Sequence, residues 1–270
     1  MMPVIYEAVA GAAWITLNRP DSGNALDRSM VEGLTSAVRR ARRDDVHVVV
    51  LRAVGNAFSV GGSLDGFAAA ADREYFVDDL AEALHRVVSD LQRMDAVVVA
   101  AVQGTAAGAG VPLAAAADIV IAAQSARFTM AYTKVGFTPD CGSSLLTATL
   151  GLHRALHLAL LNPMLTAQQL HEAGLVAAVH PDEQLTDELE RVVAALLSGS
   201  WRAQVATKHL LRDVATPHAE GALRRETLAV RAAAGGPDGH EGVDAFLARR
   251  PPQFPSARSP LNPDQEPSHA

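Results

Sequence analysis

Two glycine-rich stretches contain the residue types that could act on a carbonyl group. NAFSVGGSLDGF occupies residues 56–67 and VQGTAAGAGVPLAAAADIVIA occupies residues 102–122, and each comes directly after an apolar run typical of a buried strand. Paired glycines allow tight turns whose backbone N–H groups point outward, and the first N–H groups of a following helix have no partner inside that helix. Two such loops at the ends of adjacent strands could aim two amides at one oxygen, as an oxyanion hole does. Ordinary turns are the alternative explanation.

A third stretch, ARFTMAYTKVGFTPDCGSSLL, occupies residues 126–146 and contains one carboxylate, Asp140, just before a helix-like run. Taken locally, an aspartate at this place is typical of a helix N-cap. The functional alternative is a carboxylate base at the entrance of a helix, facing the two glycine-rich loops. The local pattern leaves both interpretations open.

The elements that must position these residues alternate between strands and helices. The runs of β-branched residues and the apolar spacings of three and four predict α/β layering rather than an all-α or all-β fold. Strands are expected within residues 12–20, 46–54, 96–102 and 118–123, and helices within 26–43, 76–94, 185–196 and around 210–214.

Composition excludes several classes of protein. The chain has 270 residues, 49% of them apolar, one cysteine (Cys141) and a net charge of −7. These values argue against a disordered chain, an internal disulfide and a cysteine-rich metal site. The negative charge and the 4% aromatic content argue against a nucleic-acid partner. With no long apolar span and no secretory signal in the sequence, we expect a cytoplasmic protein without a membrane partner.

Five motifs resemble, in order and spacing, those of the enoyl-CoA hydratase/isomerase, or crotonase, superfamily. They are ITLNRPDSGNAL, VVVLRAVGNAFSVGGSLDGF, VQGTAAGAGVPLAAAADIVIAA, ARFTMAYTKVGFTPDCGSS and EGVDAFLARRPPQF, within residues 4–255. The resemblance implies a crotonase-like α/β superhelix of ββα units with a C-terminal helical region used for trimerisation. On this basis we expect an α/β core over 1–195, a helical region over 196–250 and a flexible proline-rich tail over 251–270.

The resemblance also implies an acyl-CoA thioester as substrate, bound by a homotrimer or hexamer. Coenzyme A would enter as part of the substrate, and neither a separate cofactor nor a metal is implied. The two amides of the oxyanion hole map onto Gly62 and Ala109. The other residues expected to contact substrate are Gly61, Ser63, Leu64, Gly108 and Gly110 in the loops, Ala57, Phe58 and Ser59 near the adenine, Tyr132 and Phe137 at the acyl group, and Lys208 and Phe246 near the nucleotide end.

The departures from the family pattern bear on the reaction. Hydratases of the family use two glutamates, and this chain has Pro112 and Tyr132 at those positions. Tyrosine, with a reference pKa near 10, is a poor base at neutral pH. Some family isomerases carry an aspartate in a GxxPD element that moves a proton between carbons of the acyl chain, and GFTPDCGSS places Asp140 there. An apolar pocket that includes Phe67 and Phe137 would raise the pKa of Asp140.

An enoyl-CoA isomerase is therefore the favoured prediction. An atypical hydratase, a thioester hydrolase and a non-catalytic acyl-CoA-binding protein are the alternatives.

Overall fold

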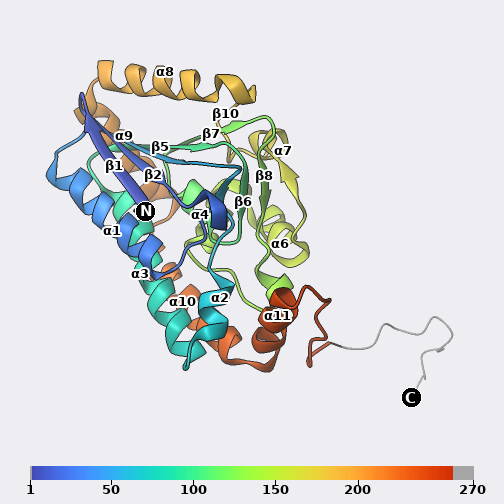
Figure 1. Ribbon diagram of the computed structural model, residues 1–270. Helices are drawn as coiled ribbons and strands as arrows, with labels where there is room; N and C mark the ends of the chain where they lie inside the picture. Colours follow the sequence, from blue (N-terminus) through green and yellow to red (C-terminus); the bar gives the residue numbers. More distant parts are fainter. Residues whose placement is uncertain (1, 258–270) are drawn as a thin grey trace.

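Six strands form the larger sheet of the computed structural model, which describes residues 2–257 (Figure 1). Their order is β1-β2-β3-β5-β7-β10. β1 runs antiparallel to β2, and every later pairing is parallel. The strands are β1 (Val4–Val9), β2 (Ala12–Leu17), β3 (Val48–Ala53), β5 (Val97–Val102), β7 (Ile119–Ala123) and β10 (Ala178–His180).

Helices cover both faces of this sheet, and its central strands β3 and β5 are almost entirely apolar, Arg52 near the end of β3 being the exception. All six residues of β5 are buried, as is typical of parallel strands between two layers of helices. One face packs on α8 through Leu185, Leu189 and Val193; α8 crosses the top of Figure 1 as a single long helix. The other face packs on α1, α3 and the rest of the main core.

Four very short strands form a second sheet in the order β4-β6-β8-β9. β4, β6 and β8 are parallel, and each follows a strand of the larger sheet after a few residues. This alternation is the repeated ββα pattern that the resemblance implied. Both glycine-rich loops leave the second sheet, one after β4 and the other after β6. The strands are β4 (Ala57–Ser59), β6 (Thr105–Ala107), β8 (Arg127–Thr129) and β9 (Leu165–Thr166).

The helices dominate the second half of the chain. α3 and α10 pack side by side at the lower left of Figure 1, and α2 and α11 lie at the bottom. The helices are α1 (Arg28–Arg43), α2 (Leu64–Ala69), α3 (Arg73–Arg93), α4 (Gly110–Ala115), α5 (Leu146–Leu150), α6 (Leu152–Leu161), α7 (Ala167–Glu172), α8 (Leu185–Ser198), α9 (Trp201–Ala215), α10 (Ala219–Gly235) and α11 (Pro237–Leu247).

The predicted elements are present, and the structure adds several that were not predicted. β1 and the strands of the second sheet are additional, and the helix that follows the second glycine-rich loop is α4, with six residues. Of the expected flexible tail, 258–270 lies outside the described residues, whereas 251–257 is bonded to α11: Gln253 N donates to Glu241 at 2.6 Å. The domain boundaries stay a prediction. Among residues 2–257, no helix combines the length and apolar character needed to cross a bilayer.

Candidate active site

A cavity of about 610 Å³ lies where the two glycine-rich loops meet α2, α3 and α11. Its wall is mainly apolar, and the buried Asp140 is one of the ionisable residues that line it. Of the predicted site residues, it is lined by Gly62, Ser63, Leu64, Gly108, Ala109, Tyr132, Phe137, Asp140 and Phe246. Gly62 and Phe246, which lie 184 positions apart in the chain, thus line one cavity.

The two glycine-rich loops touch backbone to backbone beside the cavity. A Cβ on Gly61, whose φ is +88°, would lie 2.8 Å from Ala107 O and 3.0 Å from Ala109 N. A Cβ on Gly110 would lie 2.4 Å from Ser59 O. The contacts of 2.8 Å and 2.4 Å are too short for a side chain, so glycine is required at both positions for the loops to approach.

The two amides expected to hold a thioester oxygen are unused within the described chain. Among residues 2–257, neither the N–H of Gly62 nor that of Ala109 donates a hydrogen bond. Ala109 has a φ of −60°, a conformation that alanine adopts without strain. Gly62 has only open space where its Cβ would be. Two free N–H groups on touching loops can together bind one oxygen that carries negative charge.

Three predicted contacts with the adenine instead lie outside the cavity. Ala57, Phe58 and Ser59 form β4, and Phe58 and Ser59 are completely buried. Ser59 Oγ donates to Asn24 O at 2.9 Å and accepts from Gly61 N at 3.1 Å. Ser59 is therefore an internal support of the first glycine-rich loop. Gly61 and Gly110 likewise act through loop packing and do not line the cavity wall.

Asp140 is a buried carboxyl group with one strong hydrogen-bond donor. Asp140 is only 8% exposed, and Tyr132 Oη donates a hydrogen bond to its Oδ1 at 2.5 Å. Burial raises the pKa of Asp140 to about 6, against the opposing effect of the Tyr132 hydrogen bond. Burial raises the pKa of Tyr132 well above its usual value, so its hydroxyl remains a donor. A carboxyl with a pKa near neutrality can both take up and release a proton.

Phe67 and Phe137, the aromatic residues predicted near Asp140, line the same cavity as Asp140. Phe67 and Phe137 meet edge to face, with ring centroids 5.1 Å apart. The N-cap interpretation of Asp140 is wrong: the short 3₁₀ helix Ser143–Leu145 has Gly142 at its N-cap and no side-chain capping bond. The Asp140 carboxylate therefore does not cap this helix, and Asp140 lines the cavity.

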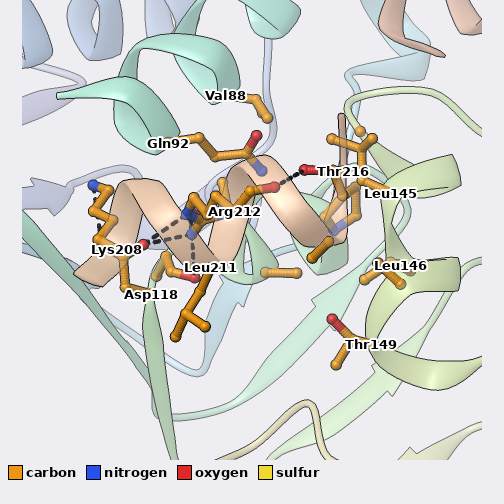
Figure 2. A pocket seen from close by; sticks show the side chains of 17 residues that line it. Val88, Gln92, Asp118, Leu145, Leu146, Thr149, Lys208, Leu211, Arg212 and Thr216 are labelled. Carbon is orange, nitrogen blue, oxygen red and sulfur yellow. Dashed lines mark hydrogen bonds and ion pairs between the residues drawn. The ribbon is translucent and has the colours of Figure 1, made fainter. Parts of the chain in front are cut away.

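Lys208 was expected near the nucleotide end of coenzyme A, and the structure places it elsewhere. Its ammonium lies 3.0 Å from Asp118 Oδ2 and donates to Leu91 O and Ala96 O. Figure 2 shows Lys208, Asp118 and Arg212 around a different pocket, along α9. Because the N–H donors of its ammonium are already bonded inside the chain, the prediction that Lys208 contacts the nucleotide is wrong, and Lys208 has a structural role. Phe246, which was also predicted to lie near the nucleotide end, does line the cavity.

Two buried polar residues next to the base were not predicted from the sequence. They are His85 on α3 and Glu226 on α10, which bond to the backbone just after Asp140. No local sequence signal distinguishes His85 or Glu226, because each is one of many polar residues in a long helix. For the described part of the chain, no cluster of His, Cys, Asp and Glu could hold a metal ion.

The family model described as enoyl-CoA hydratase/isomerase matches residues 7–257. The chain belongs to the enoyl-CoA hydratase/isomerase family. The 1,2-epoxyphenylacetyl-CoA isomerase of Escherichia coli is 36% identical over 261 residues, covering 94% of this chain and 99% of the relative. A probable enoyl-CoA hydratase of Rhodobacter capsulatus is also 36% identical, over 92% of this chain and 96% of its own.

Solved structures of the family have the same fold. An enoyl-CoA hydratase from Mycobacterium avium subsp. paratuberculosis superposes with a TM-score of 0.86 at 35% identity, over 93% of this chain and 98% of the other. The crotonase-like α/β architecture that the sequence predicted is therefore confirmed. The relatives of this chain include proteins named as isomerases and as hydratases, so the choice between the two reactions depends on the site itself.

Proposed function

We propose that this protein is an enoyl-CoA isomerase that uses Asp140 as its single base. The observation that carries the proposal is a buried carboxyl, with a pKa raised to about 6, in the same cavity as the amides of Gly62 and Ala109. At the two positions where family hydratases have glutamates, this chain has Pro112 and Tyr132. One base is enough for isomerisation, because no water molecule has to be activated.

The reaction would proceed by moving one proton. Ionised Asp140 removes a proton from C2 or C4 of the acyl chain, and the electron pair of that C–H bond delocalises onto the thioester oxygen. The N–H groups of Gly62 and Ala109 stabilise the resulting enolate. Protonated Asp140 then returns the proton to the other carbon, and the double bond is shifted. Atoms and charge balance without water or a redox partner.

The direct test is to incubate the protein with 3-enoyl-CoA and 2-enoyl-CoA thioesters of several chain lengths in deuterated water. We expect interconversion of the two isomers with deuterium entering at C2 or C4. Formation of 3-hydroxyacyl-CoA without isomerisation would favour an atypical hydratase, and release of free coenzyme A would favour a hydrolase. Tight binding without exchange on any substrate would favour a non-catalytic acyl-CoA-binding protein. Each of these results would overturn the proposal.

The contact between the two loops gives a sharp test of the oxyanion hole. Gly61→Ala should reduce turnover about 10²–10³-fold, the usual effect of losing one oxyanion donor, because its methyl group would push Ala109 N away. Gly174→Ala, at a glycine with the same φ of +88° that does not line the cavity, is the matched control. Its methyl group would approach only Thr149 O, at 4.0 Å, so its turnover should stay within a few-fold of the parent. Equal losses in the two variants, measured as kcat, would contradict this geometry.

We also propose that the chain assembles as a homotrimer or hexamer. Its second half leaves apolar side chains uncovered on α9, where Leu210, Leu211 and Val214 are exposed, Val214 at 75%. Sedimentation at micromolar concentration should show a trimer or hexamer, and Val214→Glu should shift it toward monomer. Val9→Glu, at an exposed valine of β1, should leave the assembly unchanged. A monomer in the parent protein would contradict the assembly.

Coenzyme A is part of the substrate in this proposal, and no separate cofactor takes part in the reaction. The cytoplasmic location stays a prediction from the sequence.

A further inference from the structure

The backbone immediately after Asp140 has a conformation that needs support. Cys141 has a φ of 60° and Gly142 a φ of 88°, so two consecutive residues are in the left-handed region. A side-chain-bearing residue in this region costs about 1–3 kcal/mol and persists only where its surroundings hold it. Cys141 carries such a side chain, and it is fully buried. The turn that presents the base is therefore held by contacts from elsewhere in the fold.

Glu226 on α10 supplies most of these contacts. Its carboxylate accepts from Gly142 N at 2.7 Å, from Ser144 N at 2.8 Å and from the Ser144 hydroxyl. The residue is only 6% exposed. A buried carboxylate is costly unless hydrogen bonds compensate it, and here the donors that do so belong to the turn after the base.

His85 on α3 completes the set. Its Nε2 accepts from Cys141 N at 2.9 Å, and its Nδ1 lies 3.0 Å from the hydroxyl of the buried Thr227. Glu226 Oε2 lies 3.3 Å from the same Nε2, so the two side chains form one cluster. The N–H groups of residues 141, 142 and 144 are thus all bound by side chains that lie 56 or more positions away.

We propose that Glu226 and His85 are positioning residues, which fix the turn 140–144 so that the Asp140 carboxyl stays aimed into the cavity. The proposal rests on the proposed function, since it assigns the two residues to the same base. α3 connects the turn with the substrate site: Leu80 and Leu84 line the cavity, and His85 follows directly. The helix that forms a wall of the cavity therefore also holds the backbone of the base.

The first test compares Glu226→Gln with Glu220→Gln. Both remove one negative charge from α10, but Glu220 is exposed, and its carboxylate bonds to Ser89 and Arg93 at the surface, away from the turn 140–144. In Glu226→Gln, an amide NH₂ group replaces one acceptor and faces a backbone donor. We expect kcat to fall about 10–100-fold, because a small misplacement of a reacting group costs up to about 10²-fold, while KM changes little. Glu220→Gln should keep both constants.

Amide hydrogen exchange provides a measurement that does not depend on activity. The N–H groups of Gly142 and Ser144 should lose protection at least about tenfold in Glu226→Gln, with protection of the β5 amides retained. Loss of protection across the whole core would mean a structural role only and would overturn the proposal. Unchanged kcat despite a released turn would also overturn it. If the parent protein isomerises no thioester, the proposed function fails. The exchange data would still show whether Glu226 holds the turn 140–144.

A second pair of variants keeps the proposal testable if Glu226→Gln does not fold. His85→Gln retains an acceptor for Cys141 N, whereas His85→Leu removes it. We expect His85→Gln to keep most of the parent kcat and His85→Leu to lose about 10-fold or more, at similar KM. Equal kcat values in the two variants would contradict a positioning role for His85.

Discussion

Replacing Asp140 by Asn should reduce isomerase turnover about 10²–10⁴-fold, the usual contribution of a general base. Asparagine has the same shape and can still accept the hydrogen bond from Tyr132 Oη, so the fold and acyl-CoA binding should survive. The measurement is kcat with a 3-enoyl-CoA substrate, together with deuterium exchange at C2 and C4. Asp213→Asn, at an exposed aspartate of α9 that does not line the cavity, is the control and should keep full activity. Retained exchange in Asp140→Asn would remove Asp140 from the mechanism.

The same substitution should stabilise the protein at alkaline pH. The pKa of Asp140 is raised from 3.8 to about 6 on folding, so the stability that its protonated form contributes is lost as the pH rises through about 6. Asparagine never ionises and avoids that loss. Above pH 6 we expect Asp140→Asn to gain up to about 3 kcal/mol over the parent, at about 1.4 kcal/mol per pKa unit, and to match it below pH 4. Urea unfolding at both pH values would measure this, and a variant less stable at pH 8 would contradict it.

The activity of the parent should depend on the same titration. We expect kcat/KM to rise with pH and to level off above about 6, where Asp140 is ionised. Tyr132→Phe removes the donor that favours the ionised form, so the rise should move to higher pH. Tyr6→Phe removes a hydroxyl that bonds to Asp44 at the surface and should leave the profile unchanged. A profile shifted to lower pH in Tyr132→Phe would contradict the role of this hydrogen bond.

Asp118→Ala should destabilise the fold by about 3–5 kcal/mol, as expected when one partner of a buried ion pair is removed. Asp118 accepts from Arg212 Nε at 2.8 Å and from Val98 N at 2.8 Å, and it faces the ammonium of Lys208 (Figure 2). Without it, Lys208, which is 7% exposed, keeps a positive charge with only carbonyl oxygens around it. The free energy of unfolding in urea measures the effect.

The pH dependence of that loss identifies its cause. Burial lowers the pKa of Lys208, and Asp118 opposes this, so removing Asp118 should lower it further. A group whose pKa falls on folding destabilises the fold while protonated, and the penalty is relieved as the pH rises. The deficit of Asp118→Ala should therefore shrink as the pH increases from neutral. Asp213→Ala is the control. Its carboxylate is exposed on α9, the helix that contains Lys208, so the substitution should change the free energy of unfolding little.

Long runs of β-branched residues made the larger sheet predictable. β3 and β5 are six-residue strands with at least four buried residues each, long enough for their composition to indicate a strand. The strands of the second sheet have two or three residues, which is too short for any periodicity. They form because the glycine-rich loops bring neighbouring segments together, and that is a property of the whole fold.

The candidate site divides in the same way. Asp140 and the two loops lie in local motifs, so their types and spacing could be recognised. His85 and Glu226 bond to the turn after the base, to Cys141 and Gly142, from 56 and 84 positions away in the chain. Nothing in their sequence neighbourhoods indicates these contacts. The misplacement of Lys208 has a similar origin, because its partner Asp118 precedes it by 90 positions and decides where the ammonium lies.

The cavity takes its walls from almost the full length of the polypeptide, from Arg19 near one end to Pro252 near the other. A ribosome-bound chain that has not yet released α11 lacks one of these walls, so the cavity is complete only in the finished fold. A ligand that binds this cavity at 100 times its dissociation constant would therefore stabilise the finished fold, and no earlier state, by about 2.7 kcal/mol.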